Sequence, residues 1–121
     1  MDYIIHMEPK YSFSELIDTT KLIENCTDKW FNQTLCRVND SIIRLGVFNE
    51  GEFHWHKHEE EDEFFYVIKG KLFIELEKET IELHLNQGIT IQKGVSHRPY
   101  VKEPTAVIMV EKDSVVPVGD K

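Results

Sequence analysis

The sequence lacks a surplus of basic residues and a long apolar run, and each absence excludes a class of protein. Acidic residues outnumber basic ones by 22 to 14, which gives the 121-residue chain a formal charge of −8. Nucleic acids and anionic membrane surfaces both require a basic face on their partner, so we expect neither as a partner. No apolar run approaches the roughly 18 residues that a membrane span needs.

Cysteine is also scarce. Cys26 and Cys36 are the only two cysteines in the chain, which is too few for a disulfide framework. The N-terminus carries Asp2 and no apolar segment of the signal-peptide type, so we expect a cytoplasmic protein with reduced, partly buried thiols. Hydrophobic residues make up 40% of the chain, which is enough for the core of one domain.

Residues 1–29 have a different pattern from the remainder of the chain. Ser12 and Glu15 stand three positions apart, as in a capping box, and apolar residues follow at helical spacing from Phe13 to Ile23. This pattern predicts a short helix in an N-terminal arm, with Asn25 close to its end.

From Trp30 onward, short apolar or alternating segments are separated by turn signals, which is typical of a β-sandwich or barrel. We expect strands over 31–38, 41–48, 53–58, 64–68, 72–77, 81–85, 89–92, 97–101 and 105–111. The predicted single domain thus consists of a helical arm over 1–29, a β-barrel over 30–111 and a tail over 112–121. We expect the tail to lie over the surface or against a partner.

One stretch of the sequence carries a metal-binding pattern. Alternation on a strand places His56 and His58 on the same face, where two imidazoles can converge on one ion. Glu63 begins the next strand, and His97 comes from a later one. Three imidazoles and one carboxylate suit a divalent iron, manganese, nickel, cobalt or zinc ion.

Alternation also assigns roles to the neighbours of these residues. His54 shares the face of His56, so it is predicted either to carry protons in the pocket or to be a hydrogen-bonded histidine at its rim. Arg98 is either a surface charge or an anchor for a carboxylate substrate. Phe65 and Val67 should form an apolar wall beside Glu63. The acidic run over 59–62 has the composition of a solvated loop.

With these motifs, the chain resembles the cupin superfamily. Its first motif is matched by Gly51, His56, His58, Glu63 and Gly70, and its second motif is matched by Gly88, Gly94 and His97. The run over 55–63 and the segment over 94–99 are similar to the small single-domain cupins called mannose-6-phosphate-isomerase-like. Gln92 replaces a proline of the second motif, and the strand before Gly94 is two residues shorter than usual. A change of two residues preserves side-chain parity, so His97 can still face inward.

The resemblance implies a double-stranded β-helix with one metal ion inside the barrel, and it implies a homodimer. Three functions fit this expectation. The chain is predicted to be a metalloenzyme of the dioxygenase, isomerase or lyase type that acts on a small anionic molecule. The alternatives are a non-catalytic module that binds or senses a small molecule, and a cupin whose metal is only structural.

Overall fold

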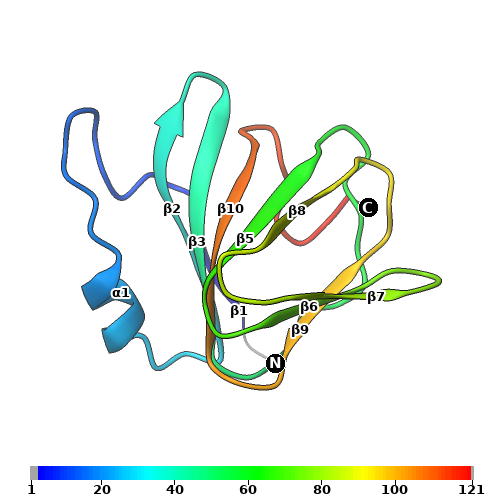
Figure 1. Ribbon diagram of the computed structural model, residues 1–121. Coiled ribbons are helices and arrows are strands. Elements are labelled where there is room, and N and C mark those ends of the chain that lie inside the picture. The colour runs from blue at the N-terminus through cyan, green and yellow to red at the C-terminus, as the bar shows by residue number, and fades with distance from the viewer. Residues whose placement is uncertain (1–2, 121) are drawn as a thin grey trace.

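The structure is a computed structural model that describes residues 3–120. Within this range, strands form two facing sheets (Figure 1). The larger sheet has the order β1-β2-β3-β10-β5-β8, and the smaller sheet has the order β4-β9-β6-β7. The elements are β1 (Tyr3–His6), α1 (Thr20–Asn25), β2 (Trp30–Val38), β3 (Ser41–Phe48), β4 (Gly51–Glu52), β5 (Glu63–Lys69), β6 (Leu72–Glu75), β7 (Thr80–Leu83), β8 (Gly88–Ile91), β9 (Arg98–Val101) and β10 (Thr105–Lys112).

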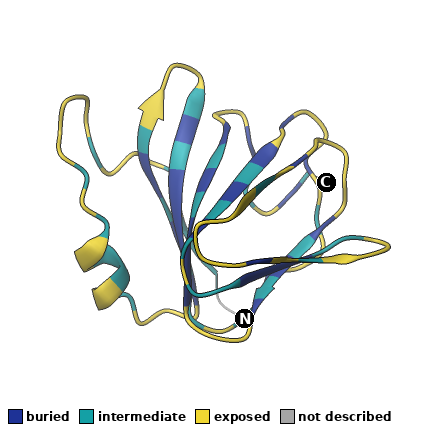
Figure 2. Cartoon of the chain, in the orientation of Figure 1, coloured by how far each residue is buried: buried dark blue, intermediate teal, exposed yellow. Residues whose placement is uncertain are grey.

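The main core lies between the two sheets, and alternation along the strands explains which residues enter it. On β5, Phe65 and Val67 are buried in this core, as predicted, whereas Phe64 and Tyr66 are only half-buried. The ring of Trp30 stacks on that of Phe48 at a centroid distance of 3.9 Å. In Figure 2 the dark blue residues accordingly follow the sheets, and the connecting loops are mostly yellow. The predicted all-β fold is therefore confirmed.

A second, smaller core lies on the outer face of the larger sheet. There Leu45 and Val47 are buried, and the N-terminal arm packs against them through Ile17, Leu22 and Ile23. The arm thus stabilises the sheet from outside and leaves the interior of the barrel free for polar groups.

The helix in the arm begins later than predicted. The amide of Ser12 does donate a hydrogen bond to Oε1 of Glu15, at 2.9 Å, but Ser14 has a φ of 64°. A helix cannot continue through this left-handed conformation, so the bond closes a turn and α1 starts only at Thr20. The arm also contains β1, which pairs in parallel with β2 and was not predicted.

The predicted strand over 53–58 is wrong. Regular pairing stops after the two residues of β4, and the chain then makes a single bridge between His56 and His97. Two reciprocal backbone hydrogen bonds, of 2.9 and 3.1 Å, hold this bridge. The segment is irregular where its side chains face the barrel interior. Within residues 3–120, no helix has the length and hydrophobicity required to cross a membrane.

Candidate metal centre

The four predicted ligands lie together inside the barrel. One ligand atom from each of His56, His58, Glu63 and His97 can be chosen so that all four lie within 4.8 Å of one another. His58, Glu63 and His97 are buried, and His56 is half-buried. Strand β5 positions the carboxylate, and the bridge between His56 and His97 fixes two of the imidazoles side by side.

Backbone contacts determine which nitrogen is available on two of the imidazoles. Nδ1 of His56 donates to the carbonyl of His54 at 3.0 Å, and Nδ1 of His97 donates to the carbonyl of Val95 at 2.9 Å. A carbonyl oxygen can only accept a hydrogen bond, so the proton of each neutral ring is on Nδ1. The lone pair on Nε2 is then available for a metal.

One contact in the group requires a cation. Nε2 of His97 lies 3.0 Å from Oε1 of Glu63. If the neutral ring keeps its proton on Nδ1, both of these atoms are acceptors and repel one another. A shared proton or a metal ion relieves the repulsion. His58 adds to this requirement, because both of its ring nitrogens are buried without a hydrogen-bond partner among the described residues.

The electrostatics of the group favour the protonation states that metal ligands need. Burial, followed by the proximity of His97, lowers the pKa of His56 to about 4. Burial alone would raise the pKa of Glu63, but its contact with His97 and the nearby imidazoles lower it below the usual value. Near neutral pH the site therefore offers a neutral imidazole at His56 and an ionised carboxylate at Glu63.

A second polar group lies beside the four residues and was missed in the sequence. The guanidinium of Arg44 is buried, donates to Thr34 and Asn32, and lies 3.7 Å from Oε1 of Glu111. Both oxygens of Glu111 are buried without a hydrogen-bond partner in the described part of the chain. Strand parity was the available signal, since Glu111 alternates with Val107 and Met109 of the core.

The space beside the metal centre is small. A cavity of about 30 Å³ lies among Arg44, His56, Glu63, Met109 and Pro117. This volume corresponds to about one water molecule. Pro117 belongs to the segment 113–120 that follows β10, which we call the C-terminal strap, so this segment lines part of the cavity.

The C-terminal strap is attached to the loop that carries the histidines. Nε2 of His54 donates to the carbonyl of Val118 at 2.6 Å, and the amide of Asp120 donates to the carbonyl of Lys57 at 2.9 Å. A carboxylate oxygen of Asp120 accepts from the amide of Glu59 at 2.5 Å. His54 is thus an exposed, hydrogen-bonded histidine at the rim, which corresponds to the second of its two predicted roles.

Arg98 does not face the site. It alternates on β9 with the buried residues Pro99 and Val101, so its side chain lies on the outer face of the smaller sheet. There it donates to Oε1 of Glu75 and lies 6.0 Å from the ring centroid of Trp55. Arg98 thus lies outside the barrel interior, and its role as an anchor for a carboxylate substrate stays a prediction.

The acidic run is not entirely a solvated loop. Glu59, Glu60 and Asp62 are exposed, but Glu61 is only 7% exposed. Its Oε2 accepts a hydrogen bond from the hydroxyl of Ser114 at 2.8 Å. Glu61, His58 and Asp120 form a second group with ligand-type atoms within 4.8 Å of one another.

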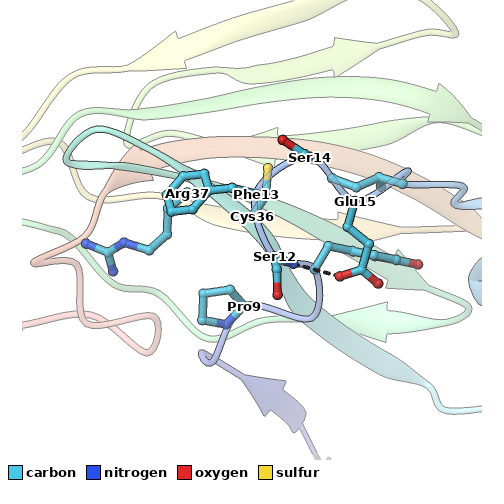
Figure 3. Close-up of a pocket in the computed structure, with 9 residues that line it drawn as sticks. Pro9, Ser12, Phe13, Ser14, Glu15, Cys36 and Arg37 are labelled. Atoms are coloured by element: carbon cyan, nitrogen blue, oxygen red, sulfur yellow. Dashed lines mark hydrogen bonds between the residues drawn. The ribbon is translucent and has the colours of Figure 1, made fainter.

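A larger hollow lies on the opposite side of the larger sheet (Figure 3). It has a volume of about 470 Å³ between the arm and β2, and Phe13, Glu15, Cys36 and Arg37 are among its lining residues. None of the four candidate ligands lines it. The larger hollow is therefore not the candidate metal site. Two of the four candidate ligands, His56 and Glu63, line the smaller cavity instead.

Comparisons with known proteins agree with this geometry. Residues 47–111 match the family Cupin_2, the cupin domain. The chain is 35% identical over 99 residues, 81% of its length, to uncharacterized protein YdbB of Bacillus subtilis (strain 168), of which it covers 87%. It is 36% identical over 62 residues, half of its length, to polyketide synthase CurC of Streptomyces cyaneus, of which it covers 40%.

Among solved structures, the chain is similar to a cupin-2 domain containing protein from Shewanella frigidimarina. The TM-score is 0.74 and the identity is 31%, and the match covers 80% of this chain and 94% of that one. The narrower resemblance to mannose-6-phosphate-isomerase-like proteins stays a prediction.

Proposed function

The chain belongs to the cupin domain family, and on this basis we propose that it is a metalloenzyme with one divalent ion inside the barrel. His56, His58, Glu63 and His97 would hold the ion. The reaction would be of the dioxygenase, isomerase or lyase type on a small anionic molecule. We further propose that the protein works as a homodimer in the cytoplasm, as the sequence predicts.

The contact between His97 and Glu63 is the observation that supports this proposal most directly. Two acceptor atoms 3.0 Å apart in a buried site need either a shared proton or a metal ion between them, and a divalent ion meets this need. Both nitrogens of buried His58 lack a hydrogen-bond partner among residues 3–120, which also supports a metal ion here. Nitrogen and oxygen donors in this ratio suit iron, manganese, nickel, cobalt or zinc.

The charge of the interior favours an anionic ligand. A divalent ion with one ionised carboxylate and neutral imidazoles leaves a net charge of about +1. Arg44 adds a buried positive charge beside the cavity, which Glu111 opposes only if it is ionised. When bound, the metal would supply a Lewis acid or a site for dioxygen. Arg44 and Asn32 would orient a carboxylate or enolate oxygen, and Phe65 and Met109 would exclude water.

A sugar phosphate is less favoured as the substrate. A phosphate group needs several basic residues around it, and Arg44 is the one basic residue among those that line the small cavity. The match to a relative named polyketide synthase supports an enzymatic role over a purely structural one.

Elemental analysis of the purified protein tests the metal centre. We expect about one divalent metal per chain in the wild-type protein and a loss of metal in His56→Ala and Glu63→Gln. His84→Ala is the matched control, because His84 is exposed and bonded only to its neighbours Glu82 and Gln87. Absence of metal from the wild-type protein, even after reconstitution with iron, manganese, nickel, cobalt and zinc, would contradict the proposal.

One observation favours the second function, a module that binds a small molecule without turnover. The cavity is small, and among the described residues that line it Arg44 is the one charged side chain outside the four candidate ligands. Turnover distinguishes the two functions. A ligand that binds to the metal-loaded protein and is recovered unchanged would support the binding module, and product formation that Glu63→Gln abolishes would support the enzyme.

A further inference from the structure

His58 differs from the other two imidazoles of the site in how its second nitrogen is satisfied. His56 and His97 each donate through Nδ1 to a backbone carbonyl. His58 is 2% exposed, and neither of its nitrogens has a hydrogen-bond partner in the described part of the chain. A metal can take only one of these nitrogens, so the other still needs an acceptor.

Two carboxylates outside the metal centre lie beside this ring. Glu61 and Asp120 each have an oxygen within 4.8 Å of a nitrogen of His58 and within 4.8 Å of each other. Glu61 is almost fully buried, and Ser114 of the C-terminal strap donates to it. Asp120 is fixed from the same strap by the amide of Glu59. Both oxygen groups are therefore held in place before any metal binds.

We propose that Glu61 and Asp120 are positioning residues that accept the proton of the non-ligating nitrogen of His58 and thereby fix this imidazole for the metal. The inference rests on the proposed metal centre and deepens it. Carboxylate acceptors of this kind orient a ligand ring, and removing them costs about 10- to 100-fold in metal affinity.

Asp120 lies on the C-terminal strap, which also lines the cavity. The strap that supplies Asp120 also places Pro117 at the cavity, so the residue that positions His58 and a residue that lines the cavity belong to one segment. We expect metal binding to order this segment, and an ordered strap then favours metal binding by the same free energy.

The affinity for Co(II), measured by competition with a chromophoric chelator, tests the proposal. We expect Glu61→Gln and Asp120→Asn to bind one Co(II) per chain with about 10-fold weaker affinity and an altered visible absorption spectrum. Both substitutions keep an oxygen acceptor for Ser114 or Glu59. Glu60→Gln is the matched control, since Glu60 is exposed in the same loop, and it should bind Co(II) as the wild-type protein does.

A double-mutant cycle separates positioning from a general loss of structure. In a His58→Ala background the further change Glu61→Gln should leave the Co(II) affinity unchanged, because the ring that it positions is absent. Amide hydrogen exchange measures how strongly the C-terminal strap is held in place. Co(II) should slow exchange of the Asp120 amide in the wild-type protein more than in Glu61→Gln.

The outcomes distinguish this inference from the function on which it rests. If the wild-type protein binds Co(II) and both carboxylate variants bind it equally well, the positioning role is overturned and the metal centre stands. If Glu61→Gln weakens binding equally with and without His58, the effect is structural and the role is also overturned. If the wild-type protein binds no Co(II), the metal centre fails and this inference fails with it.

Discussion

Glu111 of β10 lies directly opposite Glu63 of β5, and both carboxyl groups are buried inside the barrel. The pKa values of these two carboxyl groups are shifted in opposite directions. Burial, together with the nearby charge of Glu63, raises the pKa of Glu111 well above its usual value. The imidazoles lower the pKa of Glu63 despite its burial. Protonation is thus favoured at Glu111 and ionisation at Glu63, so Glu63 is the carboxyl disposed to carry the charge that a metal requires.

Glu111→Gln should therefore be tolerated in the metal-free protein. A raised folded-state pKa gives stability below the unfolded value near 4.5, and this stability is lost as the pH rises through the folded pKa. Glutamine stays neutral at every pH, so we expect the variant to match the wild-type protein at pH 4 and to exceed it at pH 8. Urea unfolding at both values measures this. A loss of about 3–5 kcal/mol at pH 8 would instead show that an ionised Glu111 pairs with Arg44.

His56 should make the metal-free protein less stable in mild acid. Its pKa is about 4 in the folded state and close to 6.5 in an unfolded chain. Between these values the unfolded state binds more protons, so stability falls as the pH decreases from 6.5 to 4. We expect a contribution on the order of 3 kcal/mol, from 1.36 kcal/mol per pKa unit. Urea unfolding measures this contribution as the loss of unfolding free energy between pH 6.5 and pH 4 that the wild-type protein shows and His56→Gln does not. The same dependence of stability on pH in both proteins would refute the prediction.

Metal should stabilise the fold through the same four residues. At a free metal concentration of about 100 times the Kd, a ligand that binds only the folded state adds about 2.7 kcal/mol. For a chain of this size we expect the melting temperature to rise by about 10 °C. Thermal unfolding with and without a chelator measures the change. An equal rise in Glu63→Gln would show that the stabilising metal binds elsewhere.

Two glycines offer a matched test of the turns that close the barrel. Gly70 and Gly94 both have positive φ, of 75° and 82°, so alanine costs about 1–2 kcal/mol of backbone strain at either position. A Cβ at Gly70 would also collide with the carbonyl of Pro104, whereas a Cβ at Gly94 meets nothing within 4 Å. We expect Gly70→Ala to be at least 1 kcal/mol more destabilising than Gly94→Ala in chemical denaturation. Equal costs would mean that the chain near Pro104 moves aside freely.

The predicted homodimer would remove an exposed apolar surface on the arm. Phe13 and Leu16 are 85% and 87% exposed, and large apolar side chains that are exposed in this way can favour association. We expect light scattering to give twice the chain mass of 14.3 kDa, and Phe13→Ser with Leu16→Ser to reduce it to one chain. A monomeric wild-type protein would refute the dimer. A double variant that remains dimeric would place the contact elsewhere.

The positions of the candidate ligands could be predicted because they depend on local parity. Alternation places His56 and His58 on one face, and the second-motif histidine follows from its spacing after Gly94. The structure brings these residues together even though the strand over 53–58 does not form, because the bridge to His97 holds the loop in place. Side-chain direction was thus easier to predict than the extent of the strand.

The features that could not be predicted from the sequence depend on the three-dimensional structure. The sequence predicts that Glu61 belongs to a solvated, charged loop. In the structure it is buried and accepts a hydrogen bond from the hydroxyl of Ser114, 53 positions away. The late start of α1 follows from the left-handed conformation of Ser14, which the spacing of Ser12 and Glu15 does not reveal. Strand β1 is apolar but short, and only its parallel pairing with β2 defines it.

The bridge between His56 and His97 joins residues that are 41 positions apart, and under the proposed function this separation sets when a metal can bind. An unfolded chain keeps His56, His58 and Glu63 close in sequence but holds them in no fixed geometry and far from His97, so it would bind a divalent ion weakly. The complete donor set exists only after the barrel has closed. If the four residues hold a metal as proposed, metallation follows folding, and the metals available in the compartment where the chain folds decide which ion binds.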